Sequence, residues 1–380
     1  MKTGVILANT GSPSSPEPED VEAYLRQFLT DPYIRQLPVK PWKLLVNHMI
    51  LPKRRFASAE RYSRIWRKDG SPLIADMQRL VDIAQRLYSL QHRAHPDTDE
   101  VLVRSGMSYG QPALLDVLEE LRFRGCERIV LLPLYPQSAF APTKAVIQSF
   151  KEALKAMDWL PDVRIVEQYG TNPLYVKAIA DSIRATGYDP AAGDRLLLSF
   201  HAIPLKDERA GDTYRSQVEE SAGLVACELG VDRDAITVGY QSVFGPKESD
   251  WVSPLTRTIL DEWRGTFDGR VILACPGFAI DCLETIDDVV REFMALVEFG
   301  VPADDIDRIA AEGDDQAAAD AERLMQVEKL LGRGVHIGSY SIGGRFVGVQ
   351  SLGPTEEHAR IIKDVLDRAL AHVPGVESEG

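Results

Sequence analysis

Short apolar runs alternate with longer helical patterns along the chain, and no other feature of the sequence constrains the fold as much. The runs are nearly continuously apolar, as expected for parallel strands that are covered on both faces. This alternation therefore predicts an α/β fold with doubly wound parallel sheets. The predicted strands are Gly4–Ala8, Val101–Arg104, Arg128–Leu132, Arg164–Glu167, Leu196–Phe200, Ile236–Tyr240 and Val271–Ala274.

The number of strands also bears on the domain organisation. At roughly 100–200 residues per domain, a chain of 380 residues should hold two or three domains. Seven or eight strands suit two similar halves better than one wide sheet, and we place the boundary near the turn Thr171–Asn172–Pro173. Near the C-terminus, Val335–Gln350 alternates apolar and polar residues around Gly343 and Gly344, which predicts a β-hairpin.

Composition and charge exclude several classes of protein. The 43 Lys and Arg residues against 57 Asp and Glu residues give a net charge of −14, which argues against general nucleic-acid binding. No apolar run reaches the ~18 residues of a membrane span, and the N-terminus lacks the pattern of a signal peptide. The four cysteines show neither a CxxC pair nor the spacing of a disulfide scaffold. We therefore expect a cytoplasmic enzyme.

Two segments differ from the rest of the chain in charge. Residues 40–68 carry nine basic residues and one acid, together with several large apolar side chains. An anionic ligand or a lipid surface would suit this composition, so residues 40–56 are expected to contact the inner face of the membrane peripherally. An ordinary amphipathic surface helix is the alternative. Residues 304–328 carry nine acids and two arginines in an Ala-rich pattern, which predicts a solvated helix.

One short string favours a hydrolase. Gly106-Met107-Ser108-Tyr109-Gly110 is a GxSxG motif between a predicted strand and a predicted helix, which is the layout of a nucleophile elbow. No HGGG-type oxyanion segment precedes it, and the histidines that come late enough to complete a triad follow no predicted strand. These are His336, His358 and His372. A serine hydrolase that uses Ser108 remains an alternative function.

A histidine and a series of acids occupy more informative positions. His201 ends a predicted strand, and ligands bind at the carboxyl edge of parallel sheets. After the buried strand Val271–Ala274, the residues Glu284, Asp288 and Glu292 recur at every fourth position, which places three carboxylates on one helix face. One imidazole with several carboxylate oxygens makes a poor permanent zinc site. It suits a divalent ion that is bound transiently and then released.

Taken together, these strings resemble the ferrochelatase family, whose members insert ferrous iron into a porphyrin to make haem. The matches follow the order of the family over about residues 1–300. They comprise Leu7–Pro13, Phe28–Pro32, Arg61–Tyr62, Ile65–Trp66, Gly70–Leu73, Leu131–Gln137, Ser199–Pro204, Gly211–Tyr214, Tyr240–Pro246, Trp251, Cys275–Phe278 and Asp281–Thr285.

The resemblance implies two Rossmann-like domains with parallel four-stranded sheets and a porphyrin cleft between them. Residues 1–172 plus a C-terminal helix at about 352–372 would form one half. Residues 173–351 would form the other, with an acidic helical insertion at about 301–334. The protein is expected to act as a monomer.

The resemblance also implies roles for individual residues. His201 and Glu284 would be the catalytic pair and would bind the ferrous iron, and Asp288 and Glu292 would extend this metal site as a route for metal or protons. The residues expected to bind the porphyrin are Thr10, Arg61, Tyr62, Ser71, Tyr135 and Trp251. Ferrous iron is a substrate in this reaction, so no cofactor is expected. A porphyrin or haem carrier without catalytic activity is the other alternative.

The chain departs from the family pattern at several positions. Ser108 stands where many relatives have an arginine, and Tyr33 replaces another arginine, with Arg35 as a stand-in. Some relatives carry a [2Fe–2S] cluster on C-terminal cysteines, but this chain has no cysteine after Cys282, so no cluster is expected. Coproporphyrin-using relatives often carry tyrosine at the position of Thr10, which favours protoporphyrin IX over coproporphyrin III as the substrate.

Overall fold

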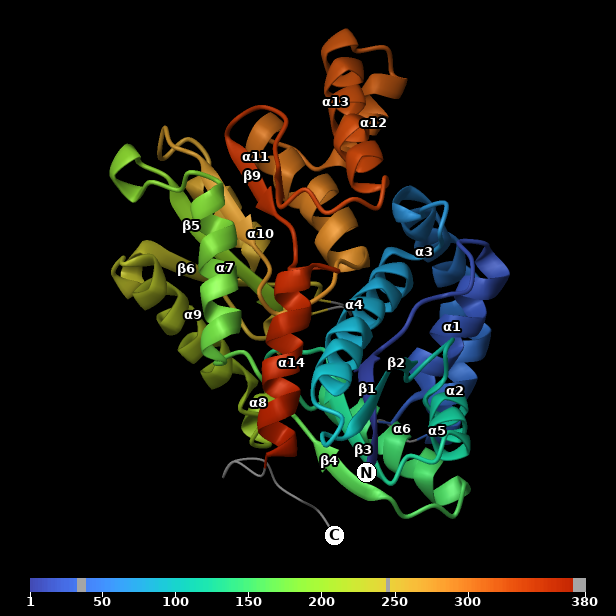
Figure 1. Ribbon diagram of the computed structural model, residues 1–380. Helices are drawn as coiled ribbons and strands as arrows, with labels where there is room; N and C mark the ends of the chain where they lie inside the picture. The colour runs from blue at the N-terminus through green and yellow to red at the C-terminus, as the bar shows by residue number, and fades with distance from the viewer. Residues whose placement is uncertain (33–38, 244–246, 372–380) are drawn as a thin grey trace. The chain divides into compact units, whose positions relative to one another are not determined.

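The computed structural model describes residues 1–32, 39–243 and 247–371, except for the side chains at positions 39 and 40 (Figure 1). Several predictions fall outside this part of the chain: Tyr33, its stand-in Arg35, His372, and residues 244–246 of a string matched to the family. The chain divides into two compact units. Unit 1 comprises Met1–Asn172 and the part of the chain from Gly353 onward, and unit 2 comprises Pro173–Leu352.

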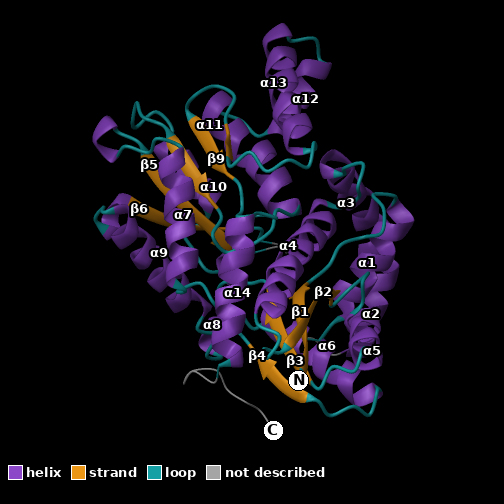
Figure 2. Ribbon diagram, viewed as in Figure 1, coloured by secondary structure: helices purple, strands orange, loops and turns teal. Residues whose placement is uncertain are grey.

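Unit 1 contains a sheet of four parallel strands in the order β2-β1-β3-β4, flanked by helices (Figure 2). Its strands are β1 (Lys2–Asn9), β2 (Glu100–Met107), β3 (Arg128–Pro133) and β4 (Asp162–Ile165). Its helices are α1 (Pro18–Thr30), α2 (Val39–Leu45), the π-helix η1 (Val46–Ile50), α3 (Leu51–Ile65), α4 (Pro72–Ala94), α5 (Leu114–Phe123), α6 (Pro142–Ala156) and α14 (Glu356–Leu370).

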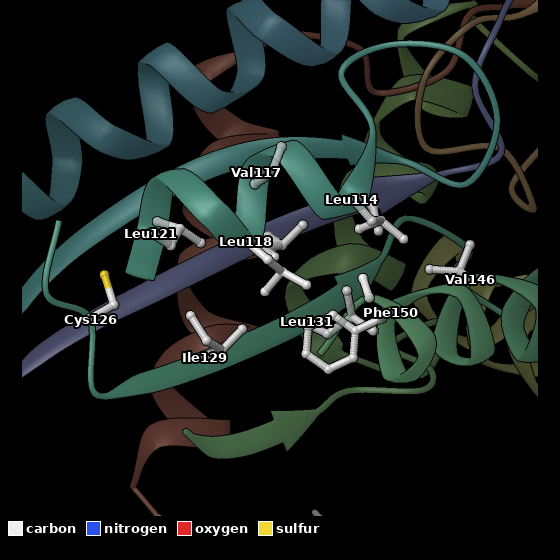
Figure 3. Packing of buried hydrophobic residues seen from close by; sticks show 12 residues of the cluster. Leu114, Val117, Leu118, Leu121, Cys126, Ile129, Leu131, Val146 and Phe150 are labelled. Carbon is white, nitrogen blue, oxygen red and sulfur yellow. The ribbon is translucent and has the colours of Figure 1, made fainter. Parts of the chain in front are cut away.

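The apolar runs of β1 and β3 are buried beneath α5 and α6. Figure 3 shows Leu118 and Leu121 directed from α5 towards the strands, and the ring of Phe150 against Leu131. All four side chains are fully buried, and burial of each such side chain contributes about 1.5–3 kcal/mol. This packing explains why the strands are apolar along their whole length.

The C-terminal helix α14 packs beside α4 and belongs to unit 1 (Figure 1). Its residues Ile361, Ile362 and Leu366 are almost fully buried. The hydroxyl of Tyr88 on α4 donates a hydrogen bond to Asp367 on α14 over 3.0 Å. Residues from the far end of the chain thus complete the core of the N-terminal unit.

Unit 2 contains five strands in the order β6-β5-β7-β9-β8. They are β5 (Arg195–His201), β6 (Ile236–Gln241), β7 (Val271–Ala274), β8 (Ser339–Tyr340) and β9 (Phe346–Val349). The helices are α7 (Pro173–Ala185), α8 (Leu205–Arg209), α9 (Tyr214–Leu229), α10 (Thr256–Trp263), the π-helix η5 (Glu284–Met294), α11 (Ala295–Phe299), α12 (Ala303–Ala311) and α13 (Asp315–Leu331), with short 3₁₀ turns η2 (Pro190–Ala192), η3 (Arg233–Ala235) and η4 (Glu248–Asp250). The predicted α/β class is confirmed.

The sheet of unit 2 differs from the prediction by one strand. Four of its strands are parallel, and β8 adds an antiparallel edge next to β9, as the predicted hairpin around Gly343 implies. The carboxylate of Glu298 accepts hydrogen bonds from the backbone N–H groups of Arg345 (3.0 Å) and Phe346 (2.7 Å). A Cβ atom at Gly343 would lie 1.9 Å from this carboxylate, so a larger residue there would displace Glu298 from these hydrogen bonds.

The acidic residues of 301–334 form a hairpin of α12 and α13 that is attached to η5. Arg291 of η5 forms ion pairs with Asp304 (3.1 Å) and Asp307 of α12 and with Glu328 of α13 (3.1 Å). Arg291 is mostly buried in these contacts, with 12% of its side chain exposed. The hairpin is therefore anchored to the helix that carries the predicted carboxylate series, although most of its acids are solvated.

A buried ion pair fixes the turn that precedes α4 in unit 1. The guanidinium of Arg67 contacts both carboxylate oxygens of Asp76, at 3.0 and 2.7 Å, and both side chains are less than 10% exposed. Arg67 and Gly70 also exchange backbone hydrogen bonds, so the turn directly before Ser71 is closed on itself. Each side chain has a further ion-pair partner, and both of these are more exposed: Asp69 lies 3.3 Å from Arg67, and Arg79 lies 2.7 Å from Asp76. Loss of Asp76 would leave the buried Arg67 with a weaker counter-charge.

We expect Asp76→Asn to lower the free energy of unfolding by about 3 kcal/mol, because Arg67 would lose its buried counter-charge and keep the more exposed Asp69. Calorimetric or urea unfolding of the whole chain measures this change. Asp82→Asn, on the exposed face of the same helix, is the control and should change stability by less than about 0.5 kcal/mol. Equal effects of the two substitutions would contradict the argument.

Candidate active site

Three elements of unit 2 present polar side chains at the carboxyl edge of its sheet. His201 is the last residue of β5, and its register partner on β6 is Gln241, the last residue of that strand. Cys275 directly follows β7, which lies on the other side of β5. Parallel strands end at one edge, so these residues gather where ligands bind in folds of this kind.

The environment of His201 selects one tautomer of its ring. The side chain is half-buried, and Nδ1 lies 2.6 Å from the backbone oxygen of Ala202. A carbonyl oxygen can only accept a hydrogen bond, so Nδ1 carries the proton, and in the neutral ring Nε2 keeps its lone pair. The ring of Phe278, from the loop after β7, lies 6.5 Å away between centroids. His201 is thus oriented as a proton acceptor.

Gln241 is the centre of a buried hydrogen-bond network. Its side-chain oxygen accepts from the hydroxyl of Ser199 on β5 (2.5 Å), and the thiol of Cys275 lies 3.9 Å away. Its nitrogen lies 3.5 Å from the backbone oxygen of Glu284. The amide therefore links the strand that ends in His201 to the start of η5, where Glu284 lies.

The same network extends to α10. The hydroxyl of Thr256 lies 2.7 Å from that of Ser199, and it donates because Ser199 already donates to Gln241. A Cβ atom at Gly239 would lie 2.8 Å from the Thr256 hydroxyl, so this close approach of α10 to β6 depends on glycine. The network thereby holds together β5, β6, α10, the start of η5 and the residue that follows β7.

The predicted carboxylate series lies on η5, which is a π-helix rather than an α-helix. Its i→i+5 bonding winds the chain more widely, so four residues fall short of one turn. Glu284, Asp288 and Glu292 are all half-buried. The hydroxyl of Ser242 lies 3.3 Å from Asp288, and Arg257 of α10 lies 3.5 Å from Glu292.

The structure does not show a preformed metal cage. Among residues 1–32, 39–243 and 247–371, no group of three or more His, Cys, Asp or Glu side chains gathers to hold a metal ion. His201, Glu284, Asp288 and Glu292 therefore do not form a closed site of three or more ligands. A series of single carboxylates along a helix is suited to brief contacts with a cation.

Asp281 fixes the chain just before η5. Its carboxylate accepts hydrogen bonds from the hydroxyl of Thr285 (3.0 Å), the backbone N–H of Ser351 (3.2 Å) and the side chain of Gln350 (3.3 Å). Burial raises the pKa of Asp281, and the bonds from Ser351 and Thr285 oppose that rise. The first turn of η5 is thus tied to the end of β9.

Trp251 lies beside the loop that follows His201. Its backbone pairs with Pro204, and the N–H of Val252 donates to the oxygen of Ile203 over 3.0 Å. The Trp251 side chain is only 8% exposed. The structure therefore brings this predicted porphyrin-binding residue close to the histidine loop within unit 2.

Two predicted porphyrin-binding residues of unit 1 are in direct contact. The hydroxyls of Thr10, after β1, and Tyr135, after β3, lie 2.5 Å apart. The side chain of Asn9 receives hydrogen bonds from the Thr10 backbone (2.7 Å) and from Tyr135 (3.2 Å). These residues occupy the carboxyl edge of the unit 1 sheet, as His201 does in unit 2.

The other predicted residues of unit 1 lie on α3 and at the start of α4. Tyr62 packs edge-on against Tyr24, whose hydroxyl donates to the backbone oxygen of Gly11 over 3.1 Å. Tyr62 is therefore linked to the loop after β1. Arg61 is half-buried one residue earlier on α3, and Ser71 is buried immediately before α4.

The alternative of a serine hydrolase finds no support at Ser108. Its hydroxyl is buried and has no hydrogen-bond partner among the described residues, so it lacks a general base. His336 and His358 instead contact backbone oxygens of Ser351 and Gly353. The GxSxG string is thus a coincidence of composition.

No role was expected from the sequence for Gln241, Ser242, Asp281 or Arg257. Gln241 and Ser242 lie in a string that was matched to the family, and the sequence signal for them was that two polar residues follow the apolar strand. The backbone of Ser242 is also unusual, with a positive φ of 62°. For a residue other than glycine, this left-handed conformation costs roughly 1–2 kcal/mol.

Comparisons with known proteins agree on one family. The family model for Ferrochelatase matches residues 2–325. The chain is 35% identical over 290 residues to Ferrochelatase of Nitrosococcus oceani, covering 76% of this chain and 77% of the relative. It is 36% identical over 291 residues to Ferrochelatase of Actinobacillus pleuropneumoniae serotype 5b, covering 77% of this chain and 87% of the relative.

Among solved structures, SirB from Bacillus subtilis with Fe3+ is similar with a TM-score of 0.46 and 10% identity, covering 98% of this chain and 96% of that chain. This likeness is weak and carries no argument. The family model and the two relatives are sufficient, and they agree with the strings found in the sequence. The chain belongs to the ferrochelatase family.

Proposed function

We propose that His201 and Glu284 carry out the reaction of this family, the insertion of ferrous iron into a porphyrin to form haem, and that the porphyrin is protoporphyrin IX. The observation that carries the proposal is the Gln241 network, which joins the strand of His201 to the helix of Glu284. His201 and Glu284 are 83 positions apart in the sequence, and the network holds both residues at the same edge of the unit 2 sheet.

The reaction exchanges two protons for one metal ion. Two inner N–H bonds of the free porphyrin break, bonds form between iron and the four ring nitrogens, and two protons leave. Iron stays in the ferrous state, so no electron donor or acceptor takes part. The ring must bend to expose its lone pairs, and remote binding contacts can supply about 1–5 kcal/mol of such distortion.

His201 is assigned as the proton acceptor. The Ala202 carbonyl holds the proton on Nδ1, which leaves Nε2 free to remove a proton from a ring nitrogen. A positioned general base contributes about 10²–10⁴ in rate. The ring orientation supports this assignment.

The carboxylates of η5 are assigned to the cation and to proton release. The backbone oxygen of Glu284 contacts Gln241, and Asp288 and Glu292 follow at intervals of four residues along the helix. Carboxylate oxygens bind divalent cations and also accept protons, so the series serves either species. Contacts with single carboxylates release an ion readily, as a substrate metal requires.

The porphyrin contacts are assigned to Thr10, Arg61, Tyr62, Ser71, Tyr135 and Trp251. Arg61 would pair with an anionic propionate, and the aromatic rings would pack on the macrocycle. Thr10 is tied to Tyr135 by a short hydrogen bond, which supports a small side chain at this position.

No resident cofactor is part of this proposal. An iron–sulfur cluster takes four thiolates, whereas Cys126 is buried in unit 1 and Cys227 is exposed on α9 of unit 2. All four cysteines are free thiols, which supports a reducing compartment, and we propose that the protein works in the cytoplasm as a monomer.

We also propose peripheral membrane contact through α2, η1 and the start of α3. Leu44, Met49 and Phe56 are 63%, 65% and 54% exposed, and the exposed Lys43 and Lys53 lie near them in sequence. Apolar side chains beside basic residues favour an anionic lipid surface. None of the helices in the described part of the chain is long and apolar enough to span a membrane.

His201→Ala should lower kcat for metalloporphyrin formation by about a hundredfold or more, with porphyrin affinity largely kept. Glu284→Gln should lower kcat and raise KM for the metal. Anaerobic assays with Fe2+ and fluorescence titration of porphyrin measure these quantities. His92→Ala is the control. His92 lies on α4 of unit 1, and its ring also contacts a backbone oxygen.

Near-normal turnover of His201→Ala would remove this histidine from the mechanism. A wild-type protein that binds porphyrin but forms no metalloporphyrin would be a carrier. Circular dichroism distinguishes both results from a loss of activity that is caused by unfolding of the protein.

Protoporphyrin IX should give a kcat/KM about tenfold or more above that of coproporphyrin III, a difference of about 1.4 kcal/mol. Thr10→Tyr should reduce this ratio, since a larger phenol would displace Tyr135 from its hydrogen bond. Steady-state assays with both porphyrins measure the ratio. A preference for coproporphyrin III in the wild type would reverse the assignment of the substrate.

The protein should sediment with vesicles that contain phosphatidylglycerol and much less with purely zwitterionic ones. The double substitution Met49→Ser and Phe56→Ser should abolish most of this binding. Met325→Ser is the matched control, because Met325 is 46% exposed but lies on the acidic helix α13. Equal recovery with both kinds of vesicle would rule out the contact.

A further inference from the structure

Ser242 combines an unfavourable backbone with a contact to the carboxylate series. It follows β6 directly and has a positive φ of 62°, which glycine would adopt freely. Its hydroxyl donates a hydrogen bond to Oδ2 of Asp288 over 3.3 Å. A serine in a conformation suited to glycine indicates that the hydroxyl itself is needed there.

The preceding residue contacts the same helix four residues earlier. The side-chain nitrogen of Gln241 lies 3.5 Å from the backbone oxygen of Glu284, four positions before Asp288. Two consecutive residues at the end of β6 therefore contact two successive positions of the series. This arrangement fixes η5 relative to the strand that pairs with His201.

The contact affects how Asp288 binds a cation. A hydrogen bond from a hydroxyl to a carboxylate is charge-assisted and limits the rotation of the carboxylate. A ligand group that is already ordered loses less freedom when it binds an ion, so the ion binds more tightly. Without the hydroxyl, one of the contacts that order the Asp288 carboxylate is lost.

We propose that Ser242 is a positioning residue that holds the carboxylate of Asp288 in the orientation in which it receives a divalent cation. This inference rests on the proposed role of the η5 carboxylates in metal delivery. In the left-handed conformation of Ser242, the hydroxyl lies within hydrogen-bond distance of Asp288.

Three substitutions separate the hydroxyl from the backbone strain. Ser242→Gly removes both, Ser242→Ala removes the hydroxyl but keeps the strain, and Ser242→Asn supplies an amide donor on a residue that tolerates a positive φ. Asp158→Gly is the control, because Asp158 is exposed in unit 1 and has a positive φ of 49°. The Gly variant should melt at a higher temperature than the Ala variant.

The measurement is calorimetric titration of the full-length protein with Zn2+, together with KM for Fe2+ in the anaerobic assay. Ser242→Gly and Ser242→Ala should both weaken Zn2+ binding and raise KM by about three- to tenfold, with kcat at saturating metal within about twofold of wild type. Ser242→Asn should recover most of the affinity. In a chain that carries Asp288→Asn, Ser242→Ala should have no further effect.

Any of the following three results would contradict the inference. Wild-type affinity in Ser242→Gly would show that the hydroxyl is dispensable, and a loss confined to Ser242→Ala would assign the effect to strain. An undiminished effect of Ser242→Ala beside Asp288→Asn would show that Ser242 does not act through Asp288.

The experiment also separates this inference from the proposed function. A wild-type protein that binds Zn2+ with the expected dependence on Ser242 but forms no metalloporphyrin would refute the proposed function alone. An active wild type with unchanged Zn2+ binding in all variants would refute the role of Ser242 alone.

Discussion

The candidate site depends on one buried amide. Gln241 is 3% exposed, and its side chain has contacts to β5, β7 and η5 at once. An unsatisfied buried amide would cost about 1–3 kcal/mol, so these elements must keep their relative positions while the protein is folded. A base that removes protons from a rigid macrocycle needs such a fixed frame, because small displacements reduce the rate strongly. The network therefore connects the stability of unit 2 to the geometry of its site.

The sequence predicted the strands well because burial on both faces makes them apolar throughout. The run Val271–Ala274 coincides with β7, and the others agree within a few residues. The short antiparallel strand β8 and its neighbour β9 lie within the segment Val335–Gln350 for which a hairpin was predicted. The π-helical winding of η5 was not predictable, because its hydrophobic periodicity resembles that of an α-helix and its winding depends on tertiary packing.

The candidate site was predictable in part and for a different reason. His201 could be identified because a histidine at the end of an apolar strand is unusual in this chain, and the acids of η5 could be identified by their spacing. For Gln241 and Ser242 the local signal was weaker, two polar residues at the end of a strand, because their importance comes from partners 42 to 46 positions away. The contact between Arg257 and Glu292 likewise becomes apparent only when α10 packs against η5.

The return of α14 to unit 1 also has a consequence for biosynthesis. Ile362 and Leu366 are fully buried beside α4, so this face of unit 1 stays uncovered until α14 has left the ribosome. The whole of unit 2 is synthesised between α4 and α14, which takes roughly 10–40 s at ordinary rates of translation. The core of unit 1 is thus completed only after unit 2 has been synthesised, and until then an apolar surface on α4 remains exposed.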